Sequence, residues 1–282
     1  MTFPILHTEA RGILSATTGF IRNAGFTHSL TPARNCTFGC SYCYVPTMGV
    51  YGGLKPEDSR QWGQFTTFKS NAAALLGKEL RPDQRIYCSP VVDPYQPAEE
   101  RERMMPAILD ILIRHSPKVF TIQTRGPLIL RDLDPIMELS RRTRLRVSFS
   151  VPTGDEEIRR IYEGRCAPFD ERLRVLQTLT DAGITTFATI APILPCDPER
   201  LAQSLLEVTT GGIVCDPFHV RATKRHGATT RDAAWRIAEH HGHEQWFDPA
   251  FQATIVDRLG KVAHAAGRRF GIGWEAFSWL AE

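Results

Sequence analysis

The sequence contains no long apolar stretch. Its 282 residues are 42% hydrophobic, but no run approaches the roughly 18 to 20 apolar residues that a helix needs to cross a bilayer. The first residues also lack the basic start and apolar core of a secretory signal. We therefore expect a cytoplasmic protein with no membrane partner, whose cysteines stay reduced.

An excess of either charge is also missing. Lys and Arg number 34 against 31 Asp and Glu, which gives a net charge of +3. This balance neither requires nor excludes a nucleic acid as partner, because binding depends on a local basic patch more than on total charge. A chain of this length buries a sizeable core, in one large domain or one domain with an appendage.

Short runs rich in β-branched and aromatic residues alternate with helical patterns. The strand-like runs occupy residues 27–34, 86–89, 119–123, 145–150 and 185–190. The helical stretches occupy residues 71–80, 99–115, 130–141 and 171–182. This alternation predicts an α/β fold with a parallel sheet built from βα repeats.

Three closely spaced cysteines are the most informative feature that is present. Cys36, Cys40 and Cys43 lie in the segment Asn-Cys-Thr-Phe-Gly-Cys-Ser-Tyr-Cys-Tyr. Three thiolates on one short loop suit three irons of a [4Fe-4S] cluster and leave the fourth iron without a protein ligand. A structural zinc site is the alternative, but it needs a fourth ligand, and the nearest downstream histidine is His115.

The triplet and several segments after it resemble the radical S-adenosylmethionine (SAM) enzymes, and more narrowly the branch similar to spore photoproduct lyase. The Cys-x-x-x-Cys-x-x-Cys motif followed by an aromatic residue carries most of the resemblance. Weaker matches occur at residues 31–36, 93–97, 130–134, 147–151 and 191–195. The resemblance implies a partial (β/α)6 TIM-like barrel over residues 27–217, after a lead-in of residues 1–26. A small C-terminal helical extension, residues 218–282, is expected to form a cap and to carry substrate specificity.

The resemblance also implies a [4Fe-4S] cluster and SAM as cofactors. An electron donor such as flavodoxin or ferredoxin would reduce the cluster, and cleavage of SAM would give a 5′-deoxyadenosyl radical that abstracts hydrogen from a substrate. Repair of a DNA lesion is one substrate hypothesis, and a peptide, nucleotide or small molecule is equally compatible, because a fold does not fix a substrate. An iron-sulfur or zinc protein that binds nucleic acid without radical chemistry is the alternative of a different class.

Polar side chains at the carboxyl ends of the expected strands are candidates for binding SAM, because function collects there in such barrels. Tyr44 occupies the aromatic position of the motif, which lies against adenine in the family; packing at the barrel mouth is the alternative. Ser89, Asp93 and Gln96 are candidates for contacts with the amino group or ribose of SAM. An Asp next to a proline also stabilises turns, so that interpretation of Asp93 stays open.

Two further SAM-binding candidates come from later strands. Arg125 stands where the lyase-like branch often has lysine, and we expect it to anchor the carboxylate of SAM or the substrate. A solvent-facing ion pair is the alternative for Arg125. Ser148 is a candidate pocket residue, as are Ser150 and Pro192.

Two residues are catalytic candidates on the basis of the resemblance. In spore photoproduct lyases a cysteine in a comparable segment returns a hydrogen atom to the product radical, and tyrosines beside the third cluster cysteine help to relay it. Cys88 and Tyr42 are the corresponding candidates here. The alternative for Cys88 is a small hydrophobic residue of the core. The remaining cysteines, Cys166, Cys196 and Cys215, form no second Cys-x-x-Cys pair and are expected to be ordinary thiols.

Two segments leave function open. Arg221, Lys224, Arg225 and His226 form either a phosphate-contacting loop or, as we favour, a solvated loop beside a packed cap. Residues 48–65 lack clear periodicity, and we expect them to form a flap beside the cluster. Amphipathic patterns predict helices over residues 231–240 and 251–266.

Overall fold

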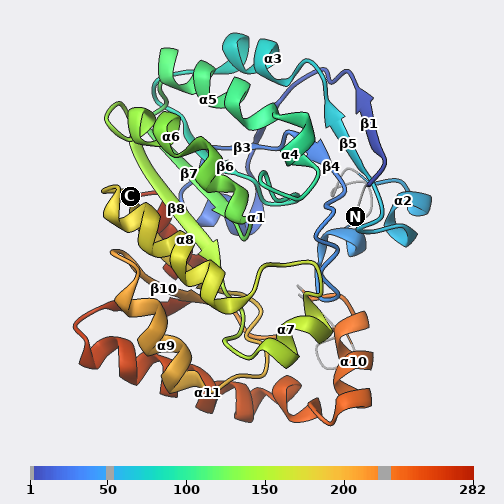
Figure 1. The fold of residues 1–282 in the computed structure, drawn as a ribbon, viewed down its shortest axis with the longest axis vertical. Helices are drawn as coiled ribbons and strands as arrows, with labels where there is room; N and C mark the ends of the chain where they lie inside the picture. The colour runs from blue at the N-terminus through green and yellow to red at the C-terminus, as the bar shows by residue number, and fades with distance from the viewer. Residues whose placement is uncertain (1–2, 49–53, 222–229) are drawn as a thin grey trace.

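The computed structural model describes residues 3–48, 54–221 and 230–282. A large sheet organises this part of the chain (Figure 1). Its strands are β2 (Leu14–Ala16), β3 (His28–Leu30), β6 (Arg85–Cys88), β7 (Val119–Thr124), β8 (Arg144–Ser150), β9 (Thr185–Ile190), β10 (Gly212–Cys215) and β11 (Arg269–Ile272). The spatial order is β11-β10-β9-β8-β7-β6-β3-β2. In this sheet β3, β6, β7, β8, β9, β10 and β11 run parallel, and β2 pairs antiparallel with β3.

Helices connect the parallel strands, as a βα-repeated sheet requires. The α-helices are α1 (Gly19–Asn23), α2 (Pro56–Arg60), α3 (Ala72–Glu79), α4 (Glu99–Glu102), α5 (Met104–Arg114), α6 (Leu133–Ser140), α7 (Glu156–Tyr162), α8 (Phe169–Asp181), α9 (Pro198–Glu207), α10 (Ala233–His241), α11 (Pro249–Ala265) and α12 (Gly273–Phe277). Short 3-10 helices are η1 (Val45–Thr47), η3 (Pro127–Asp132), η4 (Glu244–Phe247) and η5 (Ser278–Leu280). Neighbouring helices pack side by side, α3 on α5, α5 on α6, and α9 on α11 (Figure 1).

Most expected strands and helices are present at close to the expected bounds. The expected strand over residues 27–34 is divided, because β3 ends at Leu30 and Ala33–Arg34 pairs in a smaller sheet. The expected helix over residues 130–141 begins as the 3-10 helix η3 and continues as α6.

The helical pattern over residues 99–115 divides at Arg103, whose φ of 55° is left-handed. The Glu99 carboxylate accepts the backbone N–H groups of Met104 and Met105 at 3.1 and 2.8 Å, so it pairs two N–H groups at the buried amino end of α5 that have no partner within the helix. These hydrogen bonds stabilise the start of α5 after the break, and a periodic sequence pattern does not reveal them.

A smaller sheet holds the segment that leads into the cysteine loop. Its strands are β1 (Ile5–Thr8), β4 (Ala33–Arg34) and β5 (Thr66–Lys69), in the order β1-β5-β4. Because β4 ends directly before Asn35 and Cys36, its pairing with β5 fixes where the loop begins. The expected flap over residues 48–65 lies partly outside the described residues. In the basic segment, Lys224, Arg225 and His226 also lie outside the described residues, whereas Arg221 is described.

The C-terminal residues add to the large sheet as well as forming helices. The predicted helices correspond to α10 and α11, and β11 pairs in parallel with β10. Arg85, at the start of β6, donates to the carbonyl of Ala281 at 2.8 Å, so the chain's last residues lie at the amino ends of the strands. Among the described residues, no helix is both long and apolar enough to cross a membrane.

Candidate functional site

A cavity of about 860 Å³ lies at the carboxyl ends of the large sheet's strands. The thiol-bearing residues Cys36, Cys40 and Cys43 all line it. Polar side chains that follow or end four consecutive strands also line it, namely Ser89 after β6, Gln123 on β7, Ser150 on β8 and Thr189 on β9. The expectation that polar groups collect at this edge is therefore confirmed.

The cysteine loop takes its shape from three special backbone positions. Asn35, with φ of 61°, accepts the N–H groups of Cys36 and Gly63 through its side-chain oxygen, both at 2.9 Å. Gly39 and Gly63 have φ of 62° and 84°. A Cβ at Gly63 would lie 2.6 Å from the Cα of Gly39, so only glycine lets the turn at residue 63 pack against the loop.

Gln96 stabilises the cysteine loop through hydrogen bonds with Thr37. Its side-chain oxygen accepts the backbone N–H of Thr37 at 2.8 Å and the Thr37 hydroxyl at 3.0 Å. Gln96 is buried and does not line the cavity. The expectation that Gln96 contacts SAM is therefore corrected: both Thr37 donors already occupy its amide oxygen, and its position is structural.

Burial and neighbouring groups shift the pKa values of the three thiols. Burial raises the pKa of the Cys36 thiol, and it raises the pKa of Cys43 to about 12. The pKa of Cys40 is lowered, chiefly by a hydrogen bond with Cys166. Thiols buried in this way suit an iron-sulfur centre, where the irons compensate the thiolate charge.

The three cysteines are not gathered around a point where a single metal ion could sit. Ligand sulfurs around one zinc, each at about 2.3 Å from it, lie roughly 4 Å apart. Within the described part of the chain, Cys40, Glu163 and Cys166 are the one group of three potential ligands whose atoms all lie within 4.8 Å of one another. Cys36, Cys40 and Cys43 do not form such a group, so at least one pair of their sulfurs lies further apart than that.

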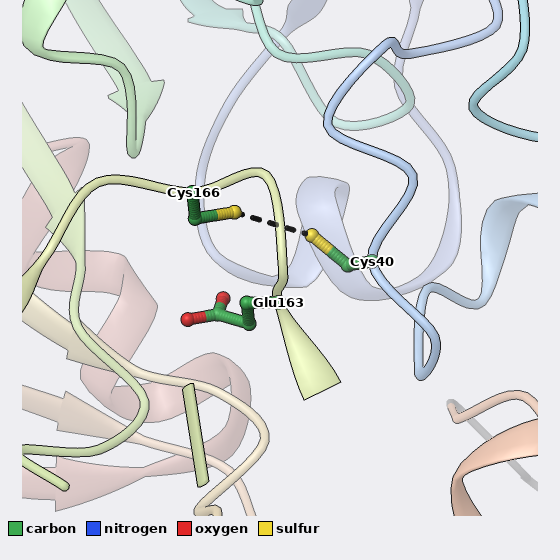
Figure 2. Close-up of side chains that lie close together, drawn as sticks. All are labelled: Cys40, Glu163 and Cys166. Atoms are coloured by element: carbon green, nitrogen blue, oxygen red, sulfur yellow. Dashed lines mark hydrogen bonds between the residues drawn. The ribbon is translucent and has the colours of Figure 1, made fainter. Parts of the chain in front are cut away.

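The side chains of Cys40, Glu163 and Cys166 lie close together (Figure 2), but this group is not a free metal site. The Glu163 carboxylate already accepts hydrogen bonds from Tyr42, Arg125 and Arg172. A cation would have to displace two guanidinium groups that neutralise this carboxylate. We therefore interpret the group as part of the environment of Cys40.

Arg125 belongs to this buried network. Its Nη1 donates to the Glu163 carboxylate and to the Tyr42 hydroxyl, and it lies 3.5 Å from the sulfur of Cys40. The Arg125 side chain is 16% exposed and Glu163 is fully buried, so the alternative of a solvent-facing ion pair is wrong. Arg125 and Tyr42 both line the cavity. A contact of Arg125 with SAM and a hydrogen relay through Tyr42 stay predictions.

Asp93 joins the ends of β6 and β7. Its carboxylate accepts the N–H groups of Tyr95 and Arg125 at 2.9 and 2.8 Å and the Thr124 hydroxyl at 2.6 Å. Burial raises the pKa of Asp93. Asp93 thus holds a turn, as one interpretation of the sequence has it, and it also lines the cavity.

Tyr44 and Ser89 line the cavity too. The Tyr44 hydroxyl donates to the carbonyl of Pro90, which holds the ring in place next to Cys43. The Ser89 hydroxyl donates to that of Thr31 at 3.2 Å. Their contacts with SAM stay predictions, and so do those of Asp93.

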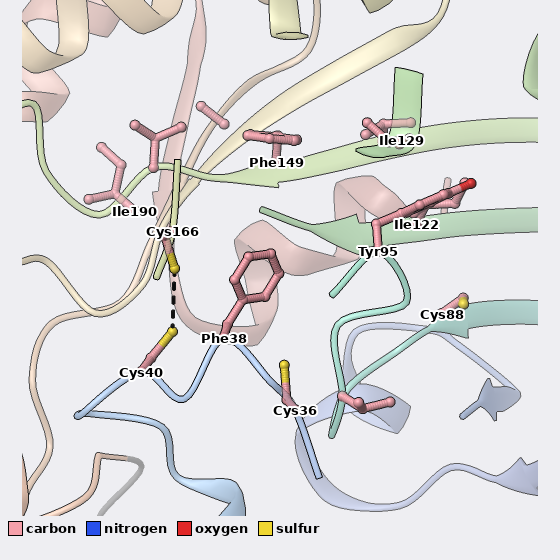
Figure 3. Close-up of a cluster of buried hydrophobic side chains, with 14 of the residues drawn as sticks. Cys36, Phe38, Cys40, Cys88, Tyr95, Ile122, Ile129, Phe149, Cys166 and Ile190 are labelled. Carbon is pink, nitrogen blue, oxygen red and sulfur yellow. Dashed lines mark hydrogen bonds between the residues drawn. The ribbon is translucent and has the colours of Figure 1, made fainter. Parts of the chain in front are cut away.

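Cys88 is in a different place from the one expected of a hydrogen donor. Successive residues of a strand face opposite sides, and on β6 it is Tyr87 that lines the cavity. Cys88 is fully buried in the hydrophobic core on the other face, together with Ile122 (Figure 3). The expectation that Cys88 faces the cofactor is therefore wrong, and the core interpretation holds.

Ser148 is also corrected. It is fully buried, does not line the cavity, and shares a hydrogen bond with the hydroxyl of Thr189. Ser150 lies two residues further along the same face of β8 and does line the cavity, as does Pro192. Of these two serines of β8, Ser150 is therefore the one that can contact a ligand in the cavity.

Tyr87, Gln123 and Ser150 form a hydrogen-bonded row across β6, β7 and β8, and Tyr87 was not identified from the sequence as part of the site. The Tyr87 hydroxyl donates to the side-chain oxygen of Gln123 at 3.0 Å, and the Gln123 amide donates to the Ser150 hydroxyl at 2.9 Å. All three residues line the cavity. The two-residue alternation of β6 was the signal that could have identified Tyr87.

Comparison with known families decides the assignment. Residues 30–205 match the family model of the radical SAM superfamily. The chain belongs to this superfamily. The resemblance found in the sequence is therefore confirmed, and membership places the chain among enzymes.

Curated relatives support the same family without adding a reaction. An uncharacterized protein of Mycobacterium tuberculosis (strain ATCC 25618 / H37Rv) is 30% identical over 210 residues, which cover 71% of this chain and 61% of that protein. One of Methanocaldococcus jannaschii is 28% identical over 160 residues, covering 57% of this chain and 58% of that protein. The chain thus spans about three fifths of the length of the relatives that it matches.

Solved structures show the fold. A variant of spore photoproduct lyase with bound SAM and dinucleoside spore photoproduct has a TM-score of 0.64, with 12% identity over 95% of this chain and 81% of that chain. Another variant has a TM-score of 0.63 and 13% identity over the same shares. The α/β fold with a parallel sheet of the radical SAM type is therefore confirmed.

Proposed function

We propose that this protein binds a [4Fe-4S] cluster through Cys36, Cys40 and Cys43 and abstracts hydrogen from a substrate by radical SAM chemistry. The observation that carries the proposal is that the three cysteines line one cavity together with polar residues from four strand ends. When bound, the reduced cluster and SAM supply a 5′-deoxyadenosyl radical. A donor such as flavodoxin or ferredoxin fits the need for one electron.

The chain's own residues bind and orient. Tyr44, Ser89 and Asp93 lie beside the loop and would hold SAM against the cluster, while Arg125 brings positive charge to the same wall. The cavity volume, about 860 Å³, is in the upper part of the range of about 300–1,000 Å³ for small-molecule sites. We infer that it holds SAM together with a reacting group of the substrate.

The identity of the substrate is a narrower question. Similarity to spore photoproduct lyases supports a DNA lesion, but it is a similarity of fold. The position of Cys88 removes the thiol that the lyase resemblance had suggested as hydrogen donor. We therefore favour abstraction of hydrogen from a substrate group that enters the cavity and contacts the polar row of Tyr87, Gln123 and Ser150.

The test is anaerobic reconstitution with iron and sulfide, followed by dithionite and SAM. We expect formation of 5′-deoxyadenosine and methionine, measured by liquid chromatography and mass spectrometry. The matched control is a variant with Cys36, Cys40 and Cys43 all changed to alanine, which should form neither. An intact cluster that gives no 5′-deoxyadenosine would favour the alternative of an iron-sulfur protein without radical chemistry.

A further inference from the structure

Cys166, from a distant loop, lies against a cysteine of the proposed cluster. Its sulfur is 3.8 Å from the sulfur of Cys40, although 126 positions separate them in the chain (Figure 2). Cys166 follows α7, and its backbone is fixed at both ends. Its N–H donates to the carbonyl of Glu163 at 2.8 Å, and its carbonyl accepts from Arg159 at 2.7 Å.

A second donor reaches the same sulfur from the segment that follows β7. Arg125 Nη1 lies 3.5 Å from the sulfur of Cys40. Glu163 orients this guanidinium, and Arg172 in turn holds Glu163 at 2.7 Å. In the described part of the chain, no side chain makes a hydrogen bond to the sulfur of Cys36 or Cys43. Of the three cysteines, Cys40 is therefore the one whose sulfur makes hydrogen bonds with side chains in the described part of the chain.

The direction of the hydrogen bond follows from the proposed chemistry. An iron-bound Cys40 is a thiolate and has no proton to give. Cys166, which binds no iron in this arrangement, is then the donor. Arg125 can act only as a donor.

We propose that Cys166 and Arg125 are positioning residues that donate to the sulfur of Cys40 and raise the reduction potential of the cluster. The inference rests on the proposed cluster binding. Hydrogen bonds to cluster sulfurs are among the features that set the potential. A reduced cluster carries one more negative charge than the oxidised one, so a donor stabilises it more.

The test compares three substitutions in the reconstituted protein without SAM. Cys166→Ala removes the donor, Cys166→Ser replaces the thiol with a hydroxyl donor, and Cys215→Ala changes another fully buried thiol that is outside the site. The midpoint potential is measured by a redox titration followed by electron paramagnetic resonance (EPR). Circular dichroism checks that each variant is folded.

We expect Cys166→Ala to reduce the equilibrium constant for cluster reduction by about three- to tenfold, where tenfold corresponds to 59 mV for one electron. Cys166→Ser should restore the potential, and Cys215→Ala should leave it unchanged. An intact cluster with the same potential in Cys166→Ala and wild type would overturn this inference alone. A wild-type chain that takes up no cluster would overturn the proposed function as well.

Discussion

The Glu163 carboxylate and the Arg172 guanidinium form an ion pair that is closed to solvent. Arg172 Nη2 donates to Glu163 at 2.7 Å, and the side chains of Arg172 and Glu163 are 1% and 0% exposed. Arg125 binds the same carboxylate from the cavity side. Burial opposes ionisation of Glu163, but Arg172 and Arg125 together hold its pKa below the usual value of 4.5.

Removing this carboxylate should destabilise the protein strongly. Glu163→Gln leaves two buried guanidinium groups without a counter-charge, and breaking a buried pair from one side costs about 3–5 kcal/mol. The free energy of unfolding, measured by urea titration of the cluster-free chain, checks this. Glu199→Gln is the matched control, because Glu199 pairs with Arg258 at the surface and should lose little. Equal losses in the two variants would contradict the interpretation.

The same pair predicts a dependence on pH. The folded-state pKa of Glu163 is below 4.5, so as the pH falls the unfolded chain takes up the proton first. The stability contributed by Glu163 is therefore complete above pH 4.5 and is lost as the pH falls through the folded-state pKa. The difference in unfolding free energy between wild type and Glu163→Gln should be constant above pH 4.5 and should become smaller as the pH falls below 4.5. A difference that grows on acidification would be the wrong sign.

The contact between Gly39 and Gly63 should control the cysteine loop. Gly63→Ala places a Cβ 2.6 Å from the Cα of Gly39 at a φ of 84°. Gly183→Ala has a similar φ of 79° but no atom within 4 Å of the new Cβ, so it isolates the backbone cost of about 1–2 kcal/mol. We expect Gly63→Ala to lose more stability and to bind less iron after reconstitution. Similar iron contents in both variants would show that the close approach does not matter.

Mild oxidation of the cluster-free chain should join Cys40 to Cys166. Diamide takes two electrons and two protons from the pair, and the sulfurs, 3.8 Å apart, need only a small shift to bond. Peptide mapping by mass spectrometry should find this disulfide, while Cys88 on the far face of β6 stays free. Pairing of Cys40 with Cys36 or Cys43 instead would contradict the observed geometry.

The sequence predicted the parallel sheet and the cysteine loop because both depend on local patterns. The alternation on β6 also contains the information that Tyr87 and Cys88 face opposite sides, but the family resemblance favoured Cys88 as the cavity residue. Ser148 was misplaced for another reason: it shares a face with Ser150, and only the tertiary structure shows that Thr189 covers it.

Other features depend on contacts between distant segments. Cys166 forms no motif with Cys40, and their proximity arises from the way α7 and its following loop pack against the cysteine loop. β11 was also not predicted, because Arg269–Ile272 is short, contains a glycine and is only partly buried at the sheet edge. Its pairing with β10 is a property of the assembled sheet.

The central claim is that one iron of the cluster has no thiolate ligand and binds SAM. The most direct measurement is the EPR spectrum of the dithionite-reduced, reconstituted protein before and after addition of SAM under anaerobic conditions. The account predicts that SAM changes the signal of the cluster, because it binds the open iron. An intact four-iron cluster whose signal does not respond to SAM would contradict it.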